Sequence, residues 1–327
     1  MTGFKSIYRY FLILILAVCV DACRKPDIPD IPDGDARPIA FEEVGTKTIF
    51  DSSNLPESFF VWGETSAGQA NVFAGVEVTG DNASGWDYLG DKKYWALYSD
   101  YDFYAVAPDG YPMTFADGEW GIDYEMPVKI STDLVADTEA HDIIVAKHER
   151  TTGDHSTAIE TAPVSFNFEH ILSRVKIVLS KSSENAGETM MVNQVYLGGL
   201  FGSGTYKFSS GWSLKQESSG AYIAYPDPGT ELQDGGVELT VGEFFVPPQT
   251  LSAEQVFLLV AFTYDNGSGS SQKYSIMPVP VNTVSEWEPA KGVTYKAVIS
   301  VDHDIIFETP TVESWGTEQT GGTIIIK

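Results

Sequence analysis

Alternation of apolar and polar residues with a period of two is the sequence feature that most constrains the fold of this chain. It recurs in YDFYAVAP (101–108), SRVKIVLS (173–180) and TYKAVISVD (294–302). Successive side chains of a strand point to opposite faces of its sheet, so this pattern predicts strands that bury one face. The side chains expected on the buried faces are Tyr101, Phe103, Ala105, Ala107, Val175, Ile177, Leu179, Tyr295, Ala297, Ile299 and Val301.

Many such segments, separated by clusters of Gly, Asp, Asn and Pro, predict an all-β protein of the β-sandwich class. QVFLLVAFTY (255–264) is apolar on both faces, which is typical of a central strand between two layers. Helical periodicity is scarce, and only TDLVADTEAHDI (132–143) and TLSAEQV (250–256) are candidates for short helices. About 290 residues follow the N-terminal region, enough for two domains of ordinary size, with the polar stretch 153–163 as the expected boundary.

The N-terminal residues have the features of an export signal. A basic start precedes ten consecutive apolar residues, 11–20, a run shorter than the ~20 residues that span a bilayer. Both cysteines of the chain, Cys19 and Cys23, lie at the end of this run, and Ala22 is the small residue that lipoprotein cleavage before Cys23 needs. We therefore expect residues 1–22 to be a lipoprotein signal peptide and Cys23 to carry the lipid. The alternative is an ordinary signal peptide that is removed together with both cysteines.

Residues 23–38 are expected to form an acidic, proline-rich tether. The stretch RKPDIPDIPDGDARP (24–38) holds four prolines and four aspartates and lacks apolar periodicity. Proline removes backbone donors and stiffens an extended chain, so this segment would hold a folded body away from a membrane surface. Acidic residues close behind the lipidated cysteine also resemble the surface-export signals of Bacteroides-type lipoproteins. Together these features predict an exported lipoprotein at the outer membrane or cell surface.

The charge of the chain narrows the range of partners. It carries 46 acidic and 20 basic residues, which gives a formal net charge of −26. Such a field repels phosphate backbones and keeps an exported protein soluble. We therefore expect no nucleic acid among its partners.

No arrangement of residues in the sequence predicts catalysis or a cofactor. The nucleophile motif G-x-S-x-G and the phosphate-binding loops G-x-x-x-x-G-K-(S/T) and G-x-G-x-x-G do not occur. His141, His148 and His155 are seven residues apart, which suggests a zinc site, but an odd spacing would place neighbours on opposite faces of a strand. We expect solvated loop histidines, no metal site, no catalytic residue and no enzyme.

Trp86, Trp95 and Trp120 lie among Gly and Asp residues that are typical of loops. If such rings were exposed, they could stack on sugars. If they were buried, they would fill the ends of a sandwich, as large aromatic side chains usually do. We expect them to be buried.

Five segments together resemble the fimbrillin family, the subunits of the type V pili of Bacteroides and Porphyromonas relatives. SFNFEHILSRVKIVLS (165–180) is similar to the family's F-x-H-x-x-S-(R/K)-(V/L) strand, and KYWALYSDYDFYAVAP (93–108) to its segment of Trp followed by F-(Y/F)-A-x-x-P. FFVPPQTL (244–251) resembles its P-Q turn, EWEPAKGVTYKAVISV (286–301) its W-x-P-G-K-x-Y motif, and VESWG (312–316) its closing tryptophan. The segments stand in the family's order, and the resemblance extends from Ile39 to the C-terminus.

The resemblance implies two tandem β-sandwich domains of transthyretin-like topology, over residues 39–160 and 161–327. It also implies a structural subunit of a fimbria, in a stalk, tip or anchor position, that serves adhesion and has no active site. Its implied partners are other fimbrial subunits, the outer membrane through the lipid on Cys23, and host or bacterial surface ligands. Ala290, which stands where the family usually has glycine, departs from the pattern.

In that family an N-terminal strand is removed by proteolysis, and the emptied groove accepts a strand from another subunit. Carried over to this chain, RPIAFEEVGTKTIF (37–50) holds the strand to be displaced. Ile39, Phe41 and Val44 are the side chains expected to fill the groove. Assembly by strand exchange is the mechanism that the resemblance implies.

The processing site of a trypsin-like protease is expected at Lys47 or at Arg37. Lys47 stands where the family's cleavage arginine would be. Arg37 is followed by Pro38, and trypsin-like enzymes cut Arg-Pro bonds poorly. Because position 47 is lysine and not arginine, the identity of the protease stays open.

The C-terminal GGTIIIK (321–327) is the candidate donor strand. Three isoleucines, Ile324, Ile325 and Ile326, follow a Gly-Gly pair that would let the segment swing out. As a donor, the segment would direct Ile324 and Ile326 into a partner's groove. Alternatively, it pairs within its own sheet.

Two other classes of function stay open on the sequence. A surface glycan-binding lipoprotein of a polysaccharide-uptake system would show exposed, coplanar Trp or Tyr pairs at one end of a sandwich. A lipoprotein glycosidase would show two carboxylates about 5 to 9.5 Å apart in a cleft. A pilus subunit would instead show an apolar groove beneath a removable first strand.

Overall fold

The computed structural model describes residues 38–41, 45–46, 57–65, 72–81, 83–95, 100–126, 129–131, 142–150, 163–216, 219–224 and 229–314. Side chains are described in these ranges except at 45–46, 129–131, 150 and 219–223. Strands dominate the described residues, and the one helical element among them is a 3-10 turn at Ser183–Asn185. The all-β, sandwich-type fold predicted from the alternation is confirmed.

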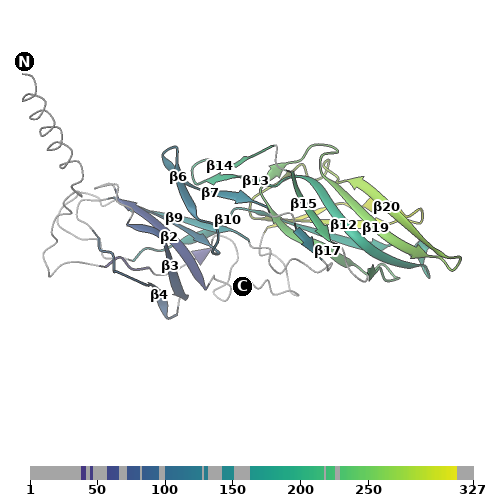
Figure 1. Ribbon diagram of the computed structural model, residues 1–327, viewed down its shortest axis with the longest axis horizontal. Coiled ribbons are helices and arrows are strands. Elements are labelled where there is room, and N and C mark those ends of the chain that lie inside the picture. Colours follow the sequence, from purple (N-terminus) through teal and green to yellow (C-terminus); the bar gives the residue numbers. More distant parts are fainter. Residues whose placement is uncertain are drawn as a thin grey trace, which may run out of the picture.

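The first sheet holds seven strands of the described chain in the order β1-β10-β9-β5-β2-β3-β4 (Figure 1). They are β1 (Gly45–Thr46), β2 (Ser58–Thr65), β3 (Phe73–Asp81), β4 (Gly85–Tyr88), β5 (Tyr101–Ala107), β9 (Ile144–Arg150) and β10 (Asn167–His170). Neighbouring strands are antiparallel except β1, which runs parallel to β10 with Gly45 opposite Asn167. β5 and β2 lie inside the sheet and bury side chains on both of their faces.

Two further sheets form a sandwich. One contains β17 (Leu239–Val246), β11 (Ser173–Lys181), β22 (Lys291–Ile299) and β23 (Ile305–Phe307), with β24 (Thr311–Ser314) also on β22. The other contains β20 (Ser270–Pro278), β19 (Phe257–Asp265), β12 (Thr189–Phe201), β15 (Ser219–Ala224) and β8 (Lys129–Ser131), with β16 (Thr230–Glu231) also on β12. Inward side chains of both sheets, among them Val175, Val195 and Val260, belong to one hydrophobic core.

Two small sheets complete the described strands. β14 (Gly211–Leu214), β13 (Ser203–Lys207), β7 (Glu119–Glu125) and β6 (Met113–Ala116) form one, and β18 (Gln249–Thr250) with β21 (Glu286–Trp287) forms the other. Five residue pairs join β7 to β13, from Ser203 opposite Glu125 to Lys207 opposite Gly121. β8 likewise pairs with β15. The division into residues 39–160 and 161–327 stays a prediction, and these pairings cross its boundary.

The buried side chains of the described residues form two hydrophobic cores. The smaller core lies on one face of the first sheet and includes Phe59, Phe73 and Phe103. The larger core fills the sandwich and continues onto the opposite face of the first sheet through Trp62 and Tyr104. Consecutive side chains along β2, and likewise along β5, therefore point into different cores, because side chains alternate between the two faces of a sheet.

Most of the predicted burial is confirmed, with two corrections. All residues expected on the buried faces are buried except Val301, which is 49% exposed because β22 ends at Ile299 and the chain turns there. The segment 250–256 is not a helix: Thr250 ends β18, and residues 253–255 form a turn. The other candidate helix, 132–143, lies almost wholly outside the described residues.

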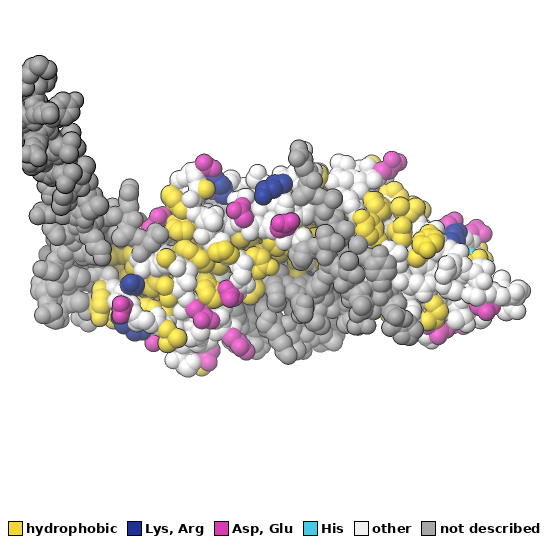
Figure 2. Space-filling view, viewed as in Figure 1, with side chains coloured by type: hydrophobic (Ala, Val, Ile, Leu, Met, Phe, Trp, Pro, Cys, Tyr) yellow, Lys and Arg dark blue, Asp and Glu magenta, His cyan; other side chains and the backbone are white. Residues whose placement is uncertain are grey.

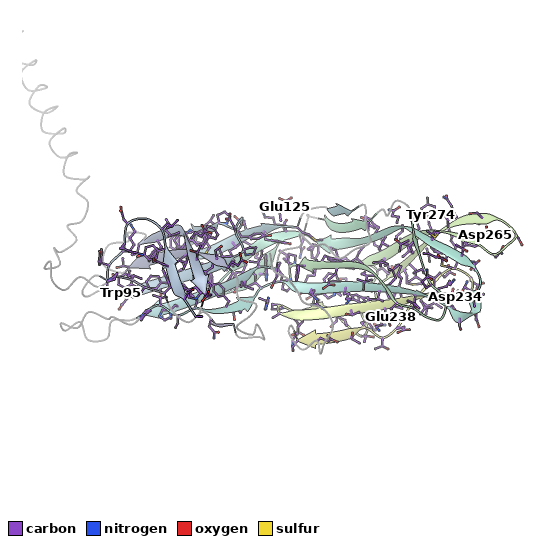
Figure 3. The ribbon with its side chains drawn as sticks, turned by 90° about the horizontal axis from the view of Figure 1, so that it is seen from below. Trp95, Glu125, Asp234, Glu238, Asp265 and Tyr274 are labelled. Atoms are coloured by element: carbon purple, nitrogen blue, oxygen red, sulfur yellow. The ribbon has the colours of Figure 1, made fainter. Side chains whose placement is uncertain are left out.

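The described molecule is elongated, with the first sheet at one end and β12, β19 and β20 toward the other (Figure 1). Trp95 and Asp265 lie near these two ends, and Glu125 lies between them (Figure 3). Between β10 and β11 the chain has only Ile171 and Leu172, and both are buried in the larger core. Within the described ranges, no helix is long and apolar enough to cross a membrane.

Candidate interaction site at residues 38–46

Residues 38–41 and β1, called the N-terminal segment below, lie against the first sheet. The side chains of Ile39 and Phe41 are 1% and 4% exposed and belong to the smaller core, whereas Pro38 and Ala40 are exposed. This alternation is that of an extended chain, in which residues two apart share a face. Ile39 and Phe41, the residues expected to fill a groove, are both buried.

Backbone hydrogen bonds hold the segment from two sides. The Ile39 amide donates to the Lys93 carbonyl at 2.8 Å, and the Val164 amide donates to the Ala40 carbonyl at 2.8 Å. The hydroxyl of Tyr88 donates to the Ile39 carbonyl at 3.3 Å. The segment is thus bonded to groups that lie far apart in the sequence.

These two sides are the opposite ends of the first sheet. β4 is the last strand at one end, and Phe41 forms an antiparallel bridge with Trp86 of β4. Phe41 also forms a parallel bridge with Val164, just before β10, and β1 continues along β10 at the other end. The N-terminal segment therefore connects both ends of the sheet. Without it, β4 and β10 would each present an unpaired edge, and an unpaired edge readily accepts another strand.

Phe41 lies at the centre of an aromatic cluster. Its ring centroid is 5.5 Å from that of Phe73, 5.9 Å from that of Tyr88 and 5.9 Å from that of Phe166, on which it stacks at 17°. Phe59 approaches edge-on at 6.3 Å. Aromatic pairs in such geometries stabilise beyond their buried area, so Phe41 is the anchor of the segment.

The other residues predicted for this site lie outside the described residues. They are Val44, the processing candidates Lys47 and Arg37, the lipidation candidate Cys23, and Ile324, Ile325 and Ile326 of the candidate donor strand. β1 ends at Thr46, so Lys47 directly follows the last described residue of the segment. The roles of these residues stay predictions.

The three tryptophans considered for sugar binding are buried, as expected. Trp86 packs against Phe59 with ring centroids 5.1 Å apart, and Trp95 against Tyr101 at 4.8 Å. Trp120 lies in the larger core. None of the three offers an exposed ring face, so they do not form the platform that the glycan-binding alternative required.

Of the three histidines considered for a zinc site, only His148 lies in the described part of the chain. His148 contacts the Ser165 carbonyl through Nδ1 at 2.9 Å, while His141 and His155 lie outside the described residues. In the described part of the chain, no three His, Cys, Asp or Glu side chains are grouped as metal ligands.

A buried polar cluster, which the sequence analysis did not predict, lies where the two cores meet. His170 at the end of β10 hydrogen-bonds through Nδ1 to Asp142, and both side chains are buried. Close by, Arg174 Nε lies 3.2 Å from Glu243, and Ser173 donates to a backbone carbonyl at 2.6 Å. Burial raises the pKa of Asp142, opposed by its hydrogen bond to His170 and by attraction to His170 and Arg174. The F-x-H-x-x-S-(R/K) pattern contains three of these residues but does not reveal Asp142.

A family model and solved structures both match this chain over most of its length. A family model described as fimbrillin-like matches residues 53–315. A solved structure of a candidate cell adhesion protein from Bacteroides ovatus is similar with a TM-score of 0.54 and 12% identity, over 87% of this chain and 100% of that chain. A second, from Bacteroides uniformis, has a TM-score of 0.52 and 17% identity, over 87% and 100%. At these identities the two structures show the fold alone. Among curated proteins, no sequence matches significantly.

Proposed function

This chain belongs to the fimbrillin-like family, and on that basis we propose that it is a structural subunit of a cell-surface fimbria that serves adhesion. Solved structures with the same fold come from candidate cell adhesion proteins of Bacteroides species, which supports the same class of function. The proposal includes no enzymatic activity. Its partners are other subunits of the fimbria.

The observation that carries the proposal is the position of the N-terminal segment between the two ends of the first sheet. The side chains of Ile39 and Phe41 lie in the smaller core, and the backbone of residues 39–40 is hydrogen-bonded to Lys93 and Val164, which are distant in sequence. A segment placed in this way can be exchanged for another strand without rebuilding the rest of the sheet. We therefore propose assembly by strand exchange, in which another subunit supplies the replacement.

The energetics of the exchange depend on the same two side chains. Burying a side chain such as Ile39 or Phe41 stabilises a fold by about 1.5–3 kcal/mol, so an empty groove would be unstable. A replacement strand therefore needs apolar residues two positions apart. Ile324 and Ile326 of the candidate donor strand have this spacing.

The two processing candidates would have different consequences. Cleavage after Lys47 would separate the whole N-terminal segment from the folded body, because β1 ends at Thr46. Cleavage after Arg37 would leave Ile39 and Phe41 attached and the groove filled. We therefore propose Lys47 as the processing site, in a precursor that is anchored in the outer membrane by a lipid on Cys23.

The test uses a purified chain of residues 24–327, which lacks the lipidation candidate Cys23, treated with limiting trypsin. N-terminal sequencing locates the cut, and SDS gels with and without boiling detect strand-exchanged polymers. We expect a cut after Lys47 followed by a ladder of SDS-resistant polymers that collapses to monomer on boiling. Lys47→Gln should prevent both, whereas the matched variant Arg37→Gln should leave both unchanged.

Two outcomes would contradict the proposal. A ladder that forms equally in the Lys47→Gln variant would show that assembly does not need release of the segment. A cut after Lys47 that yields only monomer at all protein concentrations would exclude self-assembly by this route.

A further inference from the structure

A hollow lies on the face of the first sheet opposite the N-terminal segment. Its volume is about 440 Å³, within the range of about 300–1,000 Å³ that is common for small-ligand sites. Ten residues line it, and those on which the argument depends are Phe60, Trp62, Ala74, Gly75, Asp109 and Tyr111. Hydrophobic side chains gather over the part of the surface where β2 and β3 lie (Figure 2).

A bulge in β3 shapes the floor of this hollow. Val61 pairs with Val76 but Trp62 pairs with Ala74, so Gly75 is an extra residue in β3, with a φ of +68°. A Cβ atom at Gly75 would lie 3.0 Å from Cζ2 of Trp62. Only glycine therefore lets the backbone pass this close to the indole ring. Because Ala74 and Gly75 have little or no side chain, the surface above Trp62 stays open.

Two aromatic rings form walls that the core holds in place. Phe60 and Tyr111 are partly exposed, and both pack against the larger core. The ring of Tyr111 is backed by Tyr124, with centroids 6.1 Å apart and planes at 30°. Their exposed parts are thus presented by side chains that have few alternative positions, which lowers the entropic cost of binding.

The charges of the hollow select against anions. Asp109 is the one charged residue among the ten that line it, and its Oδ1 accepts the Gly110 amide at 2.6 Å. The formal net charge of −26 acts in the same direction. A single carboxylate also lacks the partner that glycoside hydrolysis needs.

We infer that this hollow binds a neutral saccharide. Sugar rings present C–H faces that stack on aromatic side chains, here Phe60 and Tyr111, and hydroxyl groups that donate to a carboxylate, here Asp109. A purely apolar ligand would make no use of the exposed carboxylate of Asp109, whereas the hydroxyl groups of a sugar can donate to its oxygens. The inference rests on the proposed adhesive function and deepens it by naming the class of ligand.

The test measures sugar binding to the unprocessed chain, residues 24–327, by saturation-transfer difference NMR and isothermal titration calorimetry. The probes are lactose, cellobiose and N-acetyllactosamine, with 3′-sialyllactose and a sulfated disaccharide as anionic comparisons. We expect at least one neutral sugar to bind and both anionic sugars to bind more weakly. Removing one stacking ring, in Phe60→Ala or Tyr111→Ala, should weaken binding roughly tenfold or more.

Two further variants separate binding from folding. Ala74→Phe fills the hollow from an exposed position of β3 without removing a core contact, and it should abolish sugar binding while the thermal unfolding midpoint stays close to that of the wild type. Tyr274→Ala removes an aromatic ring that is exposed on β20, which lies toward the opposite end of the molecule from β2 and β3 (Figure 1), and it should leave sugar binding unchanged.

The inference is overturned if none of the neutral sugars binds, if the anionic sugars bind more tightly, or if Ala74→Phe binds like the wild type. Because the measurement uses monomeric chain before any proteolysis, it is independent of strand exchange. Ala74→Phe should still form the SDS-resistant ladder after trypsin treatment, so failure of sugar binding and failure of assembly are distinguishable.

Discussion

Phe41 shows how much a single residue can contribute to the first sheet. Its backbone bridges Trp86 at one end of the sheet and Val164 near the other, and its ring lies among Phe73, Phe166 and two further aromatic rings. Substituting this side chain removes burial and aromatic contacts at once. Because no other residue is altered, any loss of stability can be assigned to the Phe41 side chain.

We expect Phe41→Ala to lower the free energy of unfolding by about 3–5 kcal/mol, the usual cost of truncating a buried phenylalanine. Urea denaturation followed by tryptophan fluorescence measures this change. The control Leu89→Ala, at a position that is 91% exposed, should stay within about 0.5 kcal/mol of the wild type. Equal stability of the two variants would mean that the N-terminal segment does not contribute to the fold.

Asp142 gives a prediction about pH. Burial raises the pKa of its carboxyl group above the ordinary value of 3.8. Between the pKa of the unfolded chain and the higher pKa of the folded chain, the folded state binds more protons. The contribution of Asp142 to stability is therefore fully present below about pH 4 and is lost as the pH rises through the folded pKa.

The measurement compares urea unfolding of the wild type and Asp142→Asn from pH 3 to pH 5.5. The free energy of unfolding of the wild type should fall relative to that of the variant as the pH increases. The exposed control Asp91→Asn should run parallel to the wild type. Parallel curves for wild type and Asp142→Asn would contradict the raised pKa.

At the scale of single elements, β12 shows how glycine permits an irregular strand. The pairing of β12 with β15 shifts between Leu197 and Leu200, and Gly199 within this bulge has a φ of +81°. A Cβ atom there would lie 1.8 Å from the carbonyl oxygen of Gln255. Both the backbone angle and the lack of space require glycine at this position.

Gly211 provides the matched control, because its φ is +73° and a Cβ atom there would meet nothing within 4 Å. We expect Gly211→Ala to cost about 1–2 kcal/mol from the backbone conformation alone. Gly199→Ala should cost at least about 3 kcal/mol, since the neighbouring backbone must also move. Urea unfolding of both variants measures the difference, and equal losses would show that the close approach to Gln255 does not matter.

The strands themselves could be predicted well because burial on one face leaves a period of two, as in Val175, Ile177 and Leu179. The pairing of those strands could not, because alternation does not identify a partner. β11 is parallel to β22, with Val175 opposite Val293, and no local signal connects them. Val301 shows a second limit: an apolar residue that continues the pattern is exposed once the chain turns.

The site was predictable to the same degree. The resemblance to the fimbrillin family points to Ile39 and Phe41 as groove-filling residues, but it does not show that the groove around them is assembled from Lys93, Val164 and β4. The saccharide hollow depends on the bulge at Gly75, where the pattern shows only a glycine within a strand. The groove requires segments that are distant in sequence to lie side by side, whereas the hollow requires the bulge in β3 together with the residues that follow β5.

At the scale of the whole molecule, the stability of the first sheet should depend on the N-terminal segment, and a separate peptide with the same sequence should be able to replace it. We expect a chain of residues 48–327, which lacks the N-terminal segment, to unfold at a lower temperature than residues 24–327. A peptide with the sequence RPIAFEEVGTK (37–47) should raise its unfolding temperature in proportion to the logarithm of the peptide concentration.

The control peptide carries aspartate at the positions of Ile39 and Phe41, and it should have no effect because charged side chains cannot enter the groove. Differential scanning calorimetry measures both. Stabilisation by both peptides alike, or by neither, would contradict the groove as the site of exchange.

The short connection between β10 and β11 has a mechanical consequence. Ile171 and Leu172 are buried, and five residue pairs join β7 to β13, so in the described part of the chain the step from β10 to β11 has no slack. A pulling force along the long axis would be transmitted through the backbone between β10 and β11 and resisted by the hydrogen bonds between β7 and β13. In a filament under flow, such a body would behave as a stiff link, and extension would begin only when strands separate.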